Sequence, residues 1–332
     1  MTKIRQVAVA RPVQADPYHV FGPLIRTLTG HPAGRWLLDH SFSKPLRAFF
    51  GRALRSLAGP DHLTFKALPA RPLVKDEGRL TVITANLWHD WPRHRQLRER
   101  LEAFARLVER EKADTVLLQE VARTADLRAD EWLAERLGMA YAYGQANGDS
   151  RINAFEEGVA ILSRYPLAEP QICHLAPKPL SLVRRLAVAA TVKAPSGDFL
   201  AVSAHLGHGR KLNTRQLTAL QEWVSVQAGH RPAIIGGDFN TGERSPQIQA
   251  LQDTWVDLYR AVNQEDDGIT YQLHWPWGDP LLRMRLDYLF LRRGRLQEEE
   301  VPWKVLEAKP AEMHGLPHSD HQAVVARLVP QA

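Results

Sequence analysis

The stretch IIGGDFNT at 234 to 241 carries the residue types best suited to chemistry. An apolar run that ends at Gly-Gly-Asp-Phe-Asn is typical of a buried strand that delivers polar side chains to a site. Side chains two residues apart on a strand share a face, so we expect Asp238 and Asn240 to emerge side by side while Phe239 turns into the packing. Asp238 could then orient an attacking water while the Asn240 amide holds an oxygen of the group attacked, and the two preceding glycines could let a substrate backbone come close. A polar strand end that caps a turn is the plainer alternative.

Nearly all of the remaining predicted strands also carry a polar residue near one end. These residues are Asn86, Glu120, His205, Asp287 and Ser319-Asp320-His321. One such residue is usually part of a turn, but burying several carboxylates together is costly unless a cation neutralises them. The candidate metal ligands all offer oxygen donors, which favours Mg²⁺ or Mn²⁺ over Zn²⁺; they are Asn86, Glu120, Asp238 and Asp320. The two histidines, His205 and His321, remain for proton transfer and for contacts with phosphate.

The elements that must position these residues follow from the apolar periodicity. It predicts helices at 95–111, 130–137 and 213–227. It predicts strands at 80–87, 115–121, 141–146, 157–163, 186–193, 199–206, 234–240, 285–292 and 323–329. So many strands with interspersed helices fit poorly into one sheet. The sequence therefore predicts an α/β fold in which two packed mixed β-sheets are flanked by helices.

Composition is that of an ordinary globular chain, with 332 residues, 44% hydrophobic and 24% charged. This length allows one large domain or two small ones. The start MTKIRQVAVARPVQ lacks the roughly 7 to 15 apolar residues of a signal peptide, and no apolar run approaches the roughly 18 residues of a membrane span. We therefore expect a cytoplasmic protein. The single cysteine, Cys173, excludes an internal disulfide.

The positive charge of the chain is concentrated at its front. Residues 1–75 hold twelve basic and three acidic residues, a net charge of +9, which leaves −3 for the rest of the +6 chain. The segment 43–59 predicts an amphipathic helix with three arginines off its apolar face, Arg47, Arg52 and Arg55. We expect a basic N-terminal extension over 1–78 and a catalytic domain over 79–332. The helix could contact an anionic membrane, which would make the protein peripheral to it, or nucleic acid; docking on the main domain or on a second subunit is the alternative.

Seven short motifs fall in a specific order over about residues 79 to 329. They are TANLW with Asn86, LLQEV with Glu120, GVAILSRYPL at 158–167, SAHL with His205, GGDFN with Asp238 and Asn240, RLDYLF with Asp287, and HSDHQAV with Asp320 and His321. In these motifs the chain resembles the endonuclease/exonuclease/phosphatase superfamily, which includes deoxyribonucleases, sphingomyelinases and tyrosyl-DNA phosphodiesterases. The resemblance implies a four-layer α/β sandwich, which agrees with the two sheets expected from periodicity.

The resemblance also implies a divalent cation, Mg²⁺ or Mn²⁺, bound by Glu120 with Asn86 and Asp320 nearby. A phosphodiester anion repels an attacking hydroxide. A metal and cationic imidazoles would therefore have to neutralise it first and then stabilise the charge that gathers in the in-line transition state.

For the chemistry itself, the resemblance implies that His321 is held by Asp287. Together with Asp238 it would activate water or stabilise the phosphorane. His205 and Asn240 would contact the phosphoryl oxygens, with His205 a candidate proton donor to the leaving group. A carboxylate beside a histidine fixes its tautomer and raises its basicity, which suits Asp287 to His321.

Two features bear on the substrate. Apurinic endonucleases carry an acid two residues past the asparagine, where this chain has Trp88, and an Asn-x-Trp start is more similar to the sphingomyelinase and tyrosyl-DNA phosphodiesterase branches. The segment Trp275-Pro276-Trp277 could stack on a base, dip into a lipid surface, or form a plain structural cluster.

The leading functional hypothesis is a metal-dependent phosphodiesterase acting on phosphodiester substrates, most often a nuclease in this superfamily. A phospholipid or sugar-phosphate hydrolase that uses the same site is its closest alternative. A catalytically silent binding module is a third, disfavoured because a scaffold needs none of the polar strand-end residues.

Overall fold

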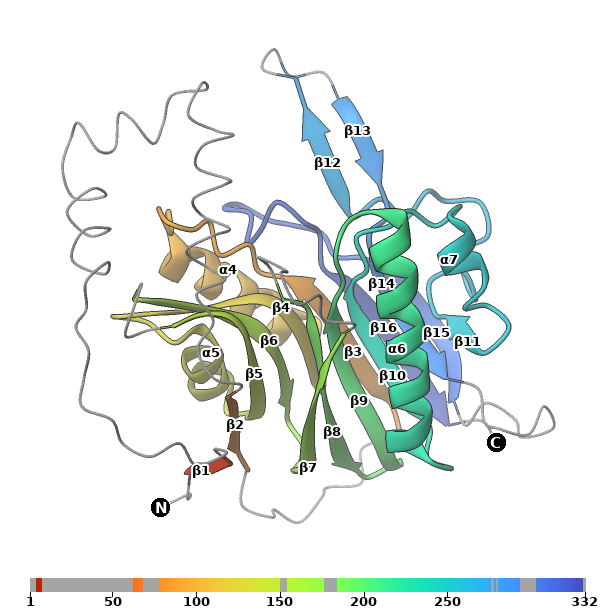
Figure 1. Ribbon diagram of the computed structural model, residues 1–332, viewed down its shortest axis with the longest axis horizontal. Coiled ribbons are helices and arrows are strands. Elements are labelled where there is room, and N and C mark those ends of the chain that lie inside the picture. The colour runs from red at the N-terminus through yellow and green to blue at the C-terminus, as the bar shows by residue number, and fades with distance from the viewer. Residues whose placement is uncertain are drawn as a thin grey trace.

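Two mixed β-sheets pack face to face, and helices cover the outer face of each (Figure 1). This computed structural model describes residues 4–7, 62–67, 78–149, 154–175, 184–275, 278, 280–292 and 303–330. The arrangement is the four-layer α/β sandwich expected from the sequence.

Within the described ranges the larger sheet has eight strands, in the order β1 (Ile4–Val7), β2 (Leu63–Lys66), β5 (Ala140–Asp149), β6 (Phe155–Ser163), β4 (Thr115–Thr124), β3 (Leu80–Asn86), β16 (Val324–Pro330) and β15 (Trp303–Pro310). The smaller sheet has six, in the order β11 (Trp255–Asp257), β14 (Asp287–Arg292), β10 (Ala233–Asp238), β9 (Gly197–His205), β8 (Leu186–Ala194) and β7 (Leu167–His174). In each sheet one parallel pair lies at the centre, β3 with β4 and β9 with β10. An antiparallel strand flanks each pair, β16 beside β3 and β14 beside β10.

Four helices were resolved in the described part of the chain, α4 (Leu97–Arg110), α5 (Ala129–Leu137), α6 (Arg210–Ala228) and the short α7 (Pro246–Gln249). The apolar spacing that predicts a helix at 95–111 matches the buried face of α4, which includes Leu101, Phe104 and Val108. α5 ends at Gly138, whose left-handed backbone conformation (φ 67°) closes the last turn. No helix among the described residues has the length and apolar content needed to span a bilayer.

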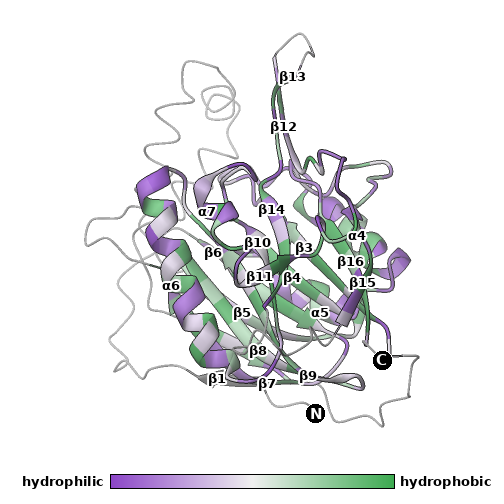
Figure 2. Cartoon of the chain, turned by 90° about the vertical axis from the view of Figure 1, so that its right-hand side faces the viewer, coloured by the Kyte–Doolittle hydropathy of each residue, from purple (hydrophilic) through white to green (hydrophobic). Residues whose placement is uncertain are grey.

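Three hydrophobic clusters separate the four layers. The first lies between the sheets and joins side chains such as Val82 and Leu117 of one sheet to Ile234 and Leu289 of the other. The second packs α4 and α5 on the larger sheet, and the third packs α6 and α7 on the smaller one. Figure 2 shows the consequence, with hydrophobic strands inside and hydrophilic residues along α6.

Gly236 of β10 lies in close contact with the facing sheet. A Cβ atom at this position would lie 2.7 Å from a Leu117 methyl group, 2.9 Å from a Leu289 methyl group and 3.0 Å from Cβ of Thr84. At the neighbouring Gly237, a Cβ atom would lie 2.0 Å from the carbonyl oxygen of Ala204. The expectation that these glycines admit a substrate is therefore wrong: they admit the facing sheet and the adjacent strand.

The strands and helices predicted after residue 78 are present, but several strands carry no apolar run and were not predicted. β7 has the sequence LAEPQICH and an exposed side, and β15 has charged residues at every second or third position. Both are edge strands, where one side of the backbone faces solvent and polar side chains are tolerated. The strand predicted at 115–121 also continues to Thr124.

The larger sheet extends into the predicted N-terminal extension. β2 pairs with β5 and also with β1, so both strands that the structure describes before residue 78 belong to the sheet. The helix predicted at 43–59 lies outside the described residues, and the division at 78/79 stays a prediction.

Candidate active site

Three of the predicted residues form one row across the smaller sheet. Asp238, the last residue of β10, pairs with His205 on β9 and with Asp287 on β14. Each lies two residues from a position that faces the other sheet, so its side chain points to the same side. The row brings two carboxylates and an imidazole together at one end of the sheet.

The larger sheet supplies a matching row. Asn86 is the last residue of β3 and pairs with Gln119 of β4, and His321 lies three residues before β16. Strict alternation would turn Glu120 toward the helices, but a bulge between Leu118 and Val121 and a left-handed conformation at Glu120 (φ 52°) redirect it. The Glu120 carboxylate therefore reaches Asn86 at the edge where both sheets meet.

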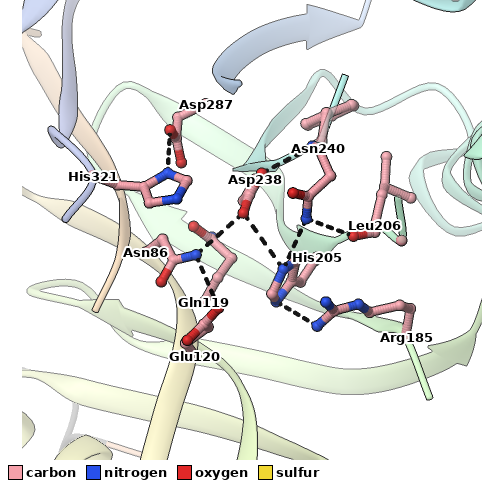
Figure 3. Close-up of polar contacts among 12 residues, drawn as sticks. Asn86, Gln119, Glu120, Arg185, His205, Leu206, Asp238, Asn240, Asp287 and His321 are labelled. Carbon is pink, nitrogen blue, oxygen red and sulfur yellow. Dashed lines mark hydrogen bonds and ion pairs between the residues drawn. The ribbon is translucent and has the colours of Figure 1, made fainter. Parts of the chain in front are cut away.

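Asn86 connects the two rows (Figure 3). Its Nδ2 lies 3.1 Å from Oδ2 of Asp238 and 3.4 Å from Oε1 of Glu120. Its Oδ1 accepts a hydrogen bond of 2.9 Å from the backbone of Trp88. In this arrangement Asn86 is a donor that joins two carboxylates.

His321 and Asp287 form a buried pair. Nδ1 of His321 lies 2.8 Å from Oδ2 of Asp287, and the two side chains are 8% and 0% exposed. Burial alone would lower the pKa of His321, but the carboxylates of Asp287, Asp238 and Asp320 outweigh it and raise the pKa to about 10. The ring is therefore protonated at neutral pH. The ring of Tyr271 packs on it with 4.8 Å between centroids.

The pKa values of Asp238 and His205 are both shifted in the direction that favours the neutral form. Burial and then the charge of Asp287 raise the pKa of Asp238 to about 7. Burial and then the positive charge of Arg185 lower the pKa of His205 well below its ordinary value. Nε2 of His205 lies 3.4 Å from Oδ2 of Asp238. At neutral pH His205 is thus a neutral ring beside a carboxylate poised to accept a proton.

Asn240 reaches the site differently from the expectation. β10 ends at Asp238, and Asn240 follows in a left-handed conformation (φ 49°), so strand alternation does not place it. Its backbone N–H donates to Oδ1 of Asp238 at 2.8 Å. Its side-chain Nδ2 lies 2.8 Å from the carbonyl oxygen of Leu206 and 3.1 Å from Nε2 of His205. Phe239 is fully buried, as expected.

Asp320 lies beside the pair but is exposed. Its pKa is raised mainly because neighbouring protein atoms desolvate the carboxyl group. His321 opposes this shift, and the negative charge of Glu120 adds to it. Glu120, Asp320 and Asn86 could offer oxygen atoms to a cation. Asp238, Asp287 and His321 also place ligand atoms within 4.8 Å of one another. In this group the proton on Nδ1 of His321 already lies in the hydrogen bond with Asp287, so a cation would have to displace this proton.

Three residues of the site were not predicted from the sequence. His89 lies 3.3 Å from Glu120 and 3.4 Å from Glu157, measured from its Nε2 to a carboxylate oxygen of each. Oε1 of Glu157 lies 3.5 Å from Nη1 of Arg185, which in turn lies 3.0 Å from Nδ1 of His205. These contacts run from Glu120 to His205. The sequence signal that could have indicated Glu157 is its place directly before the apolar stretch GVAIL of β6, next to Glu156.

Sequence and structure comparisons agree on the relationship. The sequence profile of the endonuclease/exonuclease/phosphatase family matches residues 83–321, whereas no curated protein matches the chain. Similar solved structures include an endonuclease/exonuclease/phosphatase from Beutenbergia cavernae, with TM-score 0.59, 21% identity, and coverage of 76% of this chain and 72% of that one. A family protein from Leptotrichia buccalis has TM-score 0.59, 21% identity and coverage of 75% and 99%.

A third similar structure is D. rerio TDP2 complexed with single strand DNA product, with TM-score 0.58, 17% identity and coverage of 75% and 98%. At these identities the structures support the fold alone. The family profile spans more than half of the chain and includes both rows of site residues. The chain therefore belongs to the endonuclease/exonuclease/phosphatase family.

Proposed function

We propose that this protein hydrolyses phosphodiester bonds with the help of a divalent cation, by in-line attack of water, and that it acts as a nuclease-like phosphodiesterase. One observation carries the proposal. The buried Asp287–His321 pair, Asp238, and the His205–Asn240 contact meet Asn86 and Glu120 at a single edge of both sheets. A catalytically silent binding module would gain nothing from burying these charges together.

The residues present fit a hard divalent cation. Glu120 and Asp320 are neighbouring carboxylates, and the negative charge of Glu120 acts on Asp320. Asn86 adds an amide oxygen if its side chain turns. All three offer oxygen atoms, which suits Mg²⁺ or Mn²⁺. Such a cation would neutralise charge on the phosphodiester and lower the barrier to attack.

The chain's own residues divide the remaining work by their protonation. Asp238, with a pKa of about 7, can accept a proton from the attacking water. Protonated His321, held by Asp287, places a positive charge beside the forming oxyanion. Neutral His205 and the Asn240 amide are hydrogen-bond donors for phosphoryl oxygens. A neutral ring carries no extra proton for a leaving group, so we assign His205 to binding.

A phospholipid hydrolase is the second candidate, because of the β12–β13 hairpin. β12 (Tyr271–His274) and β13 (Pro280–Met284) project beyond the sheets (Figure 1). The hairpin exposes large apolar side chains, each between 42% and 44% exposed: Leu273, Trp275, Leu281 and Leu282. Its base touches the site, since Tyr271 packs on His321 and the Thr270 hydroxyl accepts from the backbone of Asp287.

The test is a hydrolysis screen of the full-length chain with Mg²⁺ or Mn²⁺ against single-stranded DNA, duplex DNA, sphingomyelin and phosphatidylcholine vesicles, a sugar phosphate, and bis-p-nitrophenyl phosphate. We expect cleavage of the small diester and of single-stranded DNA, and loss of both in Asp238→Asn. Preferential vesicle hydrolysis that is lost in Leu281→Ser/Leu282→Ser would favour the lipid alternative. Absence of any hydrolysis, or hydrolysis that Asp238→Asn leaves intact, would refute the proposal.

A further inference from the structure

Arg185 approaches His205 on the side away from Asp238. Its Nη1 lies 3.0 Å from Nδ1 of His205, and its side chain is 12% exposed. A guanidinium group can only donate hydrogen bonds, so Nδ1 must be the acceptor in this contact. A neutral imidazole carries one N–H, which must then be on Nε2. We propose that Arg185 is a positioning residue that fixes His205 in the Nε2–H tautomer, and so prepares a binding site for one phosphoryl oxygen of the substrate.

The surroundings of Nε2 show what this tautomer does (Figure 3). One N–H of the Asn240 amide donates to the carbonyl oxygen of Leu206 at 2.8 Å, and the amide nitrogen lies 3.1 Å from Nε2 of His205. With the proton on Nε2, two donors lie side by side, which is unfavourable until both can donate to one acceptor. The carboxylate of Asp238, 3.4 Å from Nε2, can serve in the resting protein. A phosphoryl oxygen would satisfy both donors during the reaction.

The other tautomer is disfavoured by charge. It would place an Nδ1–H against the guanidinium at 3.0 Å, so that a cation and a donor face each other in a buried site. Among the described residues, Nε of Arg185 is buried without a hydrogen-bond partner. Nη1, by contrast, lies against both Nδ1 of His205 and Oε1 of Glu157, so the contacts of this guanidinium are made at the end that faces His205. This favours a role exerted on His205.

Glu157 holds Arg185 in place from the opposite sheet. It lies on β6, is 3% exposed, and its Oε1 is 3.5 Å from Nη1 of Arg185. Its other oxygen lies 3.4 Å from His89, which also contacts Glu120. The contact that sets the His205 tautomer is thus tied to the candidate metal ligand by way of two buried side chains.

The test compares Arg185→Gln with Arg185→Lys in the full-length chain. Glutamine is uncharged and can accept a hydrogen bond from an Nδ1–H, whereas lysine, like arginine, can only donate. The tautomer is read from ¹H–¹⁵N correlations of the His205 ring, assigned by its loss in His205→Gln. We expect Nε2–H in the wild type and in Arg185→Lys, and a shift to Nδ1–H in Arg185→Gln. We also expect kcat on bis-p-nitrophenyl phosphate to fall about 10- to 100-fold in Arg185→Gln with little change in KM, and Arg185→Lys to restore most of it.

The neighbouring arginine provides a matched control. Arg184 donates from Nε to the carbonyl oxygen of Ala146 at 3.0 Å, away from His205. Arg184→Gln removes the same charge one residue away and should leave both the tautomer and kcat unchanged. An unchanged tautomer in Arg185→Gln, or equal kcat losses in Arg185→Gln and Arg185→Lys, would overturn the proposal. The inference rests on the proposed function, but the tautomer is measured without substrate. The expected tautomers in a protein that hydrolyses nothing would therefore refute the function and not the role of Arg185.

Discussion

Replacing His321 by alanine should destabilise the fold as well as remove activity, because it leaves the Asp287 carboxylate buried alone. Asp287 is fully buried, and its Oδ2 lies 2.8 Å from Nδ1 of His321. Its Oδ1 has no hydrogen-bond partner among the described residues. Breaking a buried pair by removing one partner costs about 3–5 kcal/mol in free energy of unfolding. We expect His321→Ala to fall in this range.

The double mutant His321→Ala/Asp287→Asn no longer buries a charge, so it should cost less than the two single mutants together. We expect a coupling free energy of about 1–3 kcal/mol between the two positions. Activity should be non-additive too, because the partners act as a unit. Each single mutant should lower kcat/KM by about 10²- to 10⁴-fold, and the double mutant should lie within about tenfold of the worse single mutant.

The assays are denaturant unfolding and hydrolysis of bis-p-nitrophenyl phosphate by the four proteins of the cycle. A control cycle uses His314 and Glu312, a histidine–carboxylate pair on the same loop that is 65% and 77% exposed, with 3.5 Å between Nε2 and Oε2. There we expect additivity within about 0.5 kcal/mol. If losses of stability and activity at His321 and Asp287 were additive as well, the two residues would not form the buried unit described above.

Four other changes have definite expected outcomes. Glu120→Gln should lower kcat more than about 100-fold, since an amide lacks the charge of a carboxylate ligand. Chelator should abolish wild-type activity until Mg²⁺ is added back, and full activity in excess chelator would contradict this. Gly236→Ala should lower the free energy of unfolding by about 1–3 kcal/mol because the added methyl group crowds the facing sheet, as measured by denaturant unfolding. Ser203→Ala, which removes buried hydrogen bonds between the sheets, should cost about 1–3 kcal/mol in the same assay. If the basic front segment recruits an anionic substrate, charge reversal of its predicted helix should slow cleavage of long DNA but not of the small diester. The difference should shrink as the salt concentration rises, and an unchanged salt response would exclude this role. The helix variant carries glutamate in place of Arg47, Arg52 and Arg55.

Strand-end residues could be found from the sequence because their signal is local. An apolar run ending in a polar residue marks Asn86, His205 and Asp238, and all three continue the face of a strand that packs against the other sheet. Glu120 was found by the same pattern, but its orientation depends on a bulge that no residue type in LLQEV announces.

The residues that the sequence did not indicate act through partners distant in the chain. Arg185 lies in a loop before β8. Its charge acts on the site only because His205 and Glu157 contact it from two different sheets. His89 likewise belongs to the site only through its contacts with Glu120 and Glu157. Such contacts are set by the packing of the sheets, which periodicity predicts only as a layer order. Edge strands such as β7 were missed for the opposite reason, since they have too little buried surface to leave an apolar pattern.

Because the site is divided between the sheets, the distance and offset between them should control its geometry. Ser203, two residues before His205, donates to the carbonyl oxygen of Leu118 at 2.9 Å and receives a hydrogen bond from Gln119 at 3.0 Å. Gln119 directly precedes Glu120. These fully buried bonds lie between Glu120, the candidate metal ligand, and His205, the histidine proposed to bind phosphate. The small size of Gly236 lets the sheets approach beside them. A substitution in this layer that preserves folding but shifts the sheets would move Glu120 relative to His205. We would then expect lower kcat without the loss of any side chain that touches substrate.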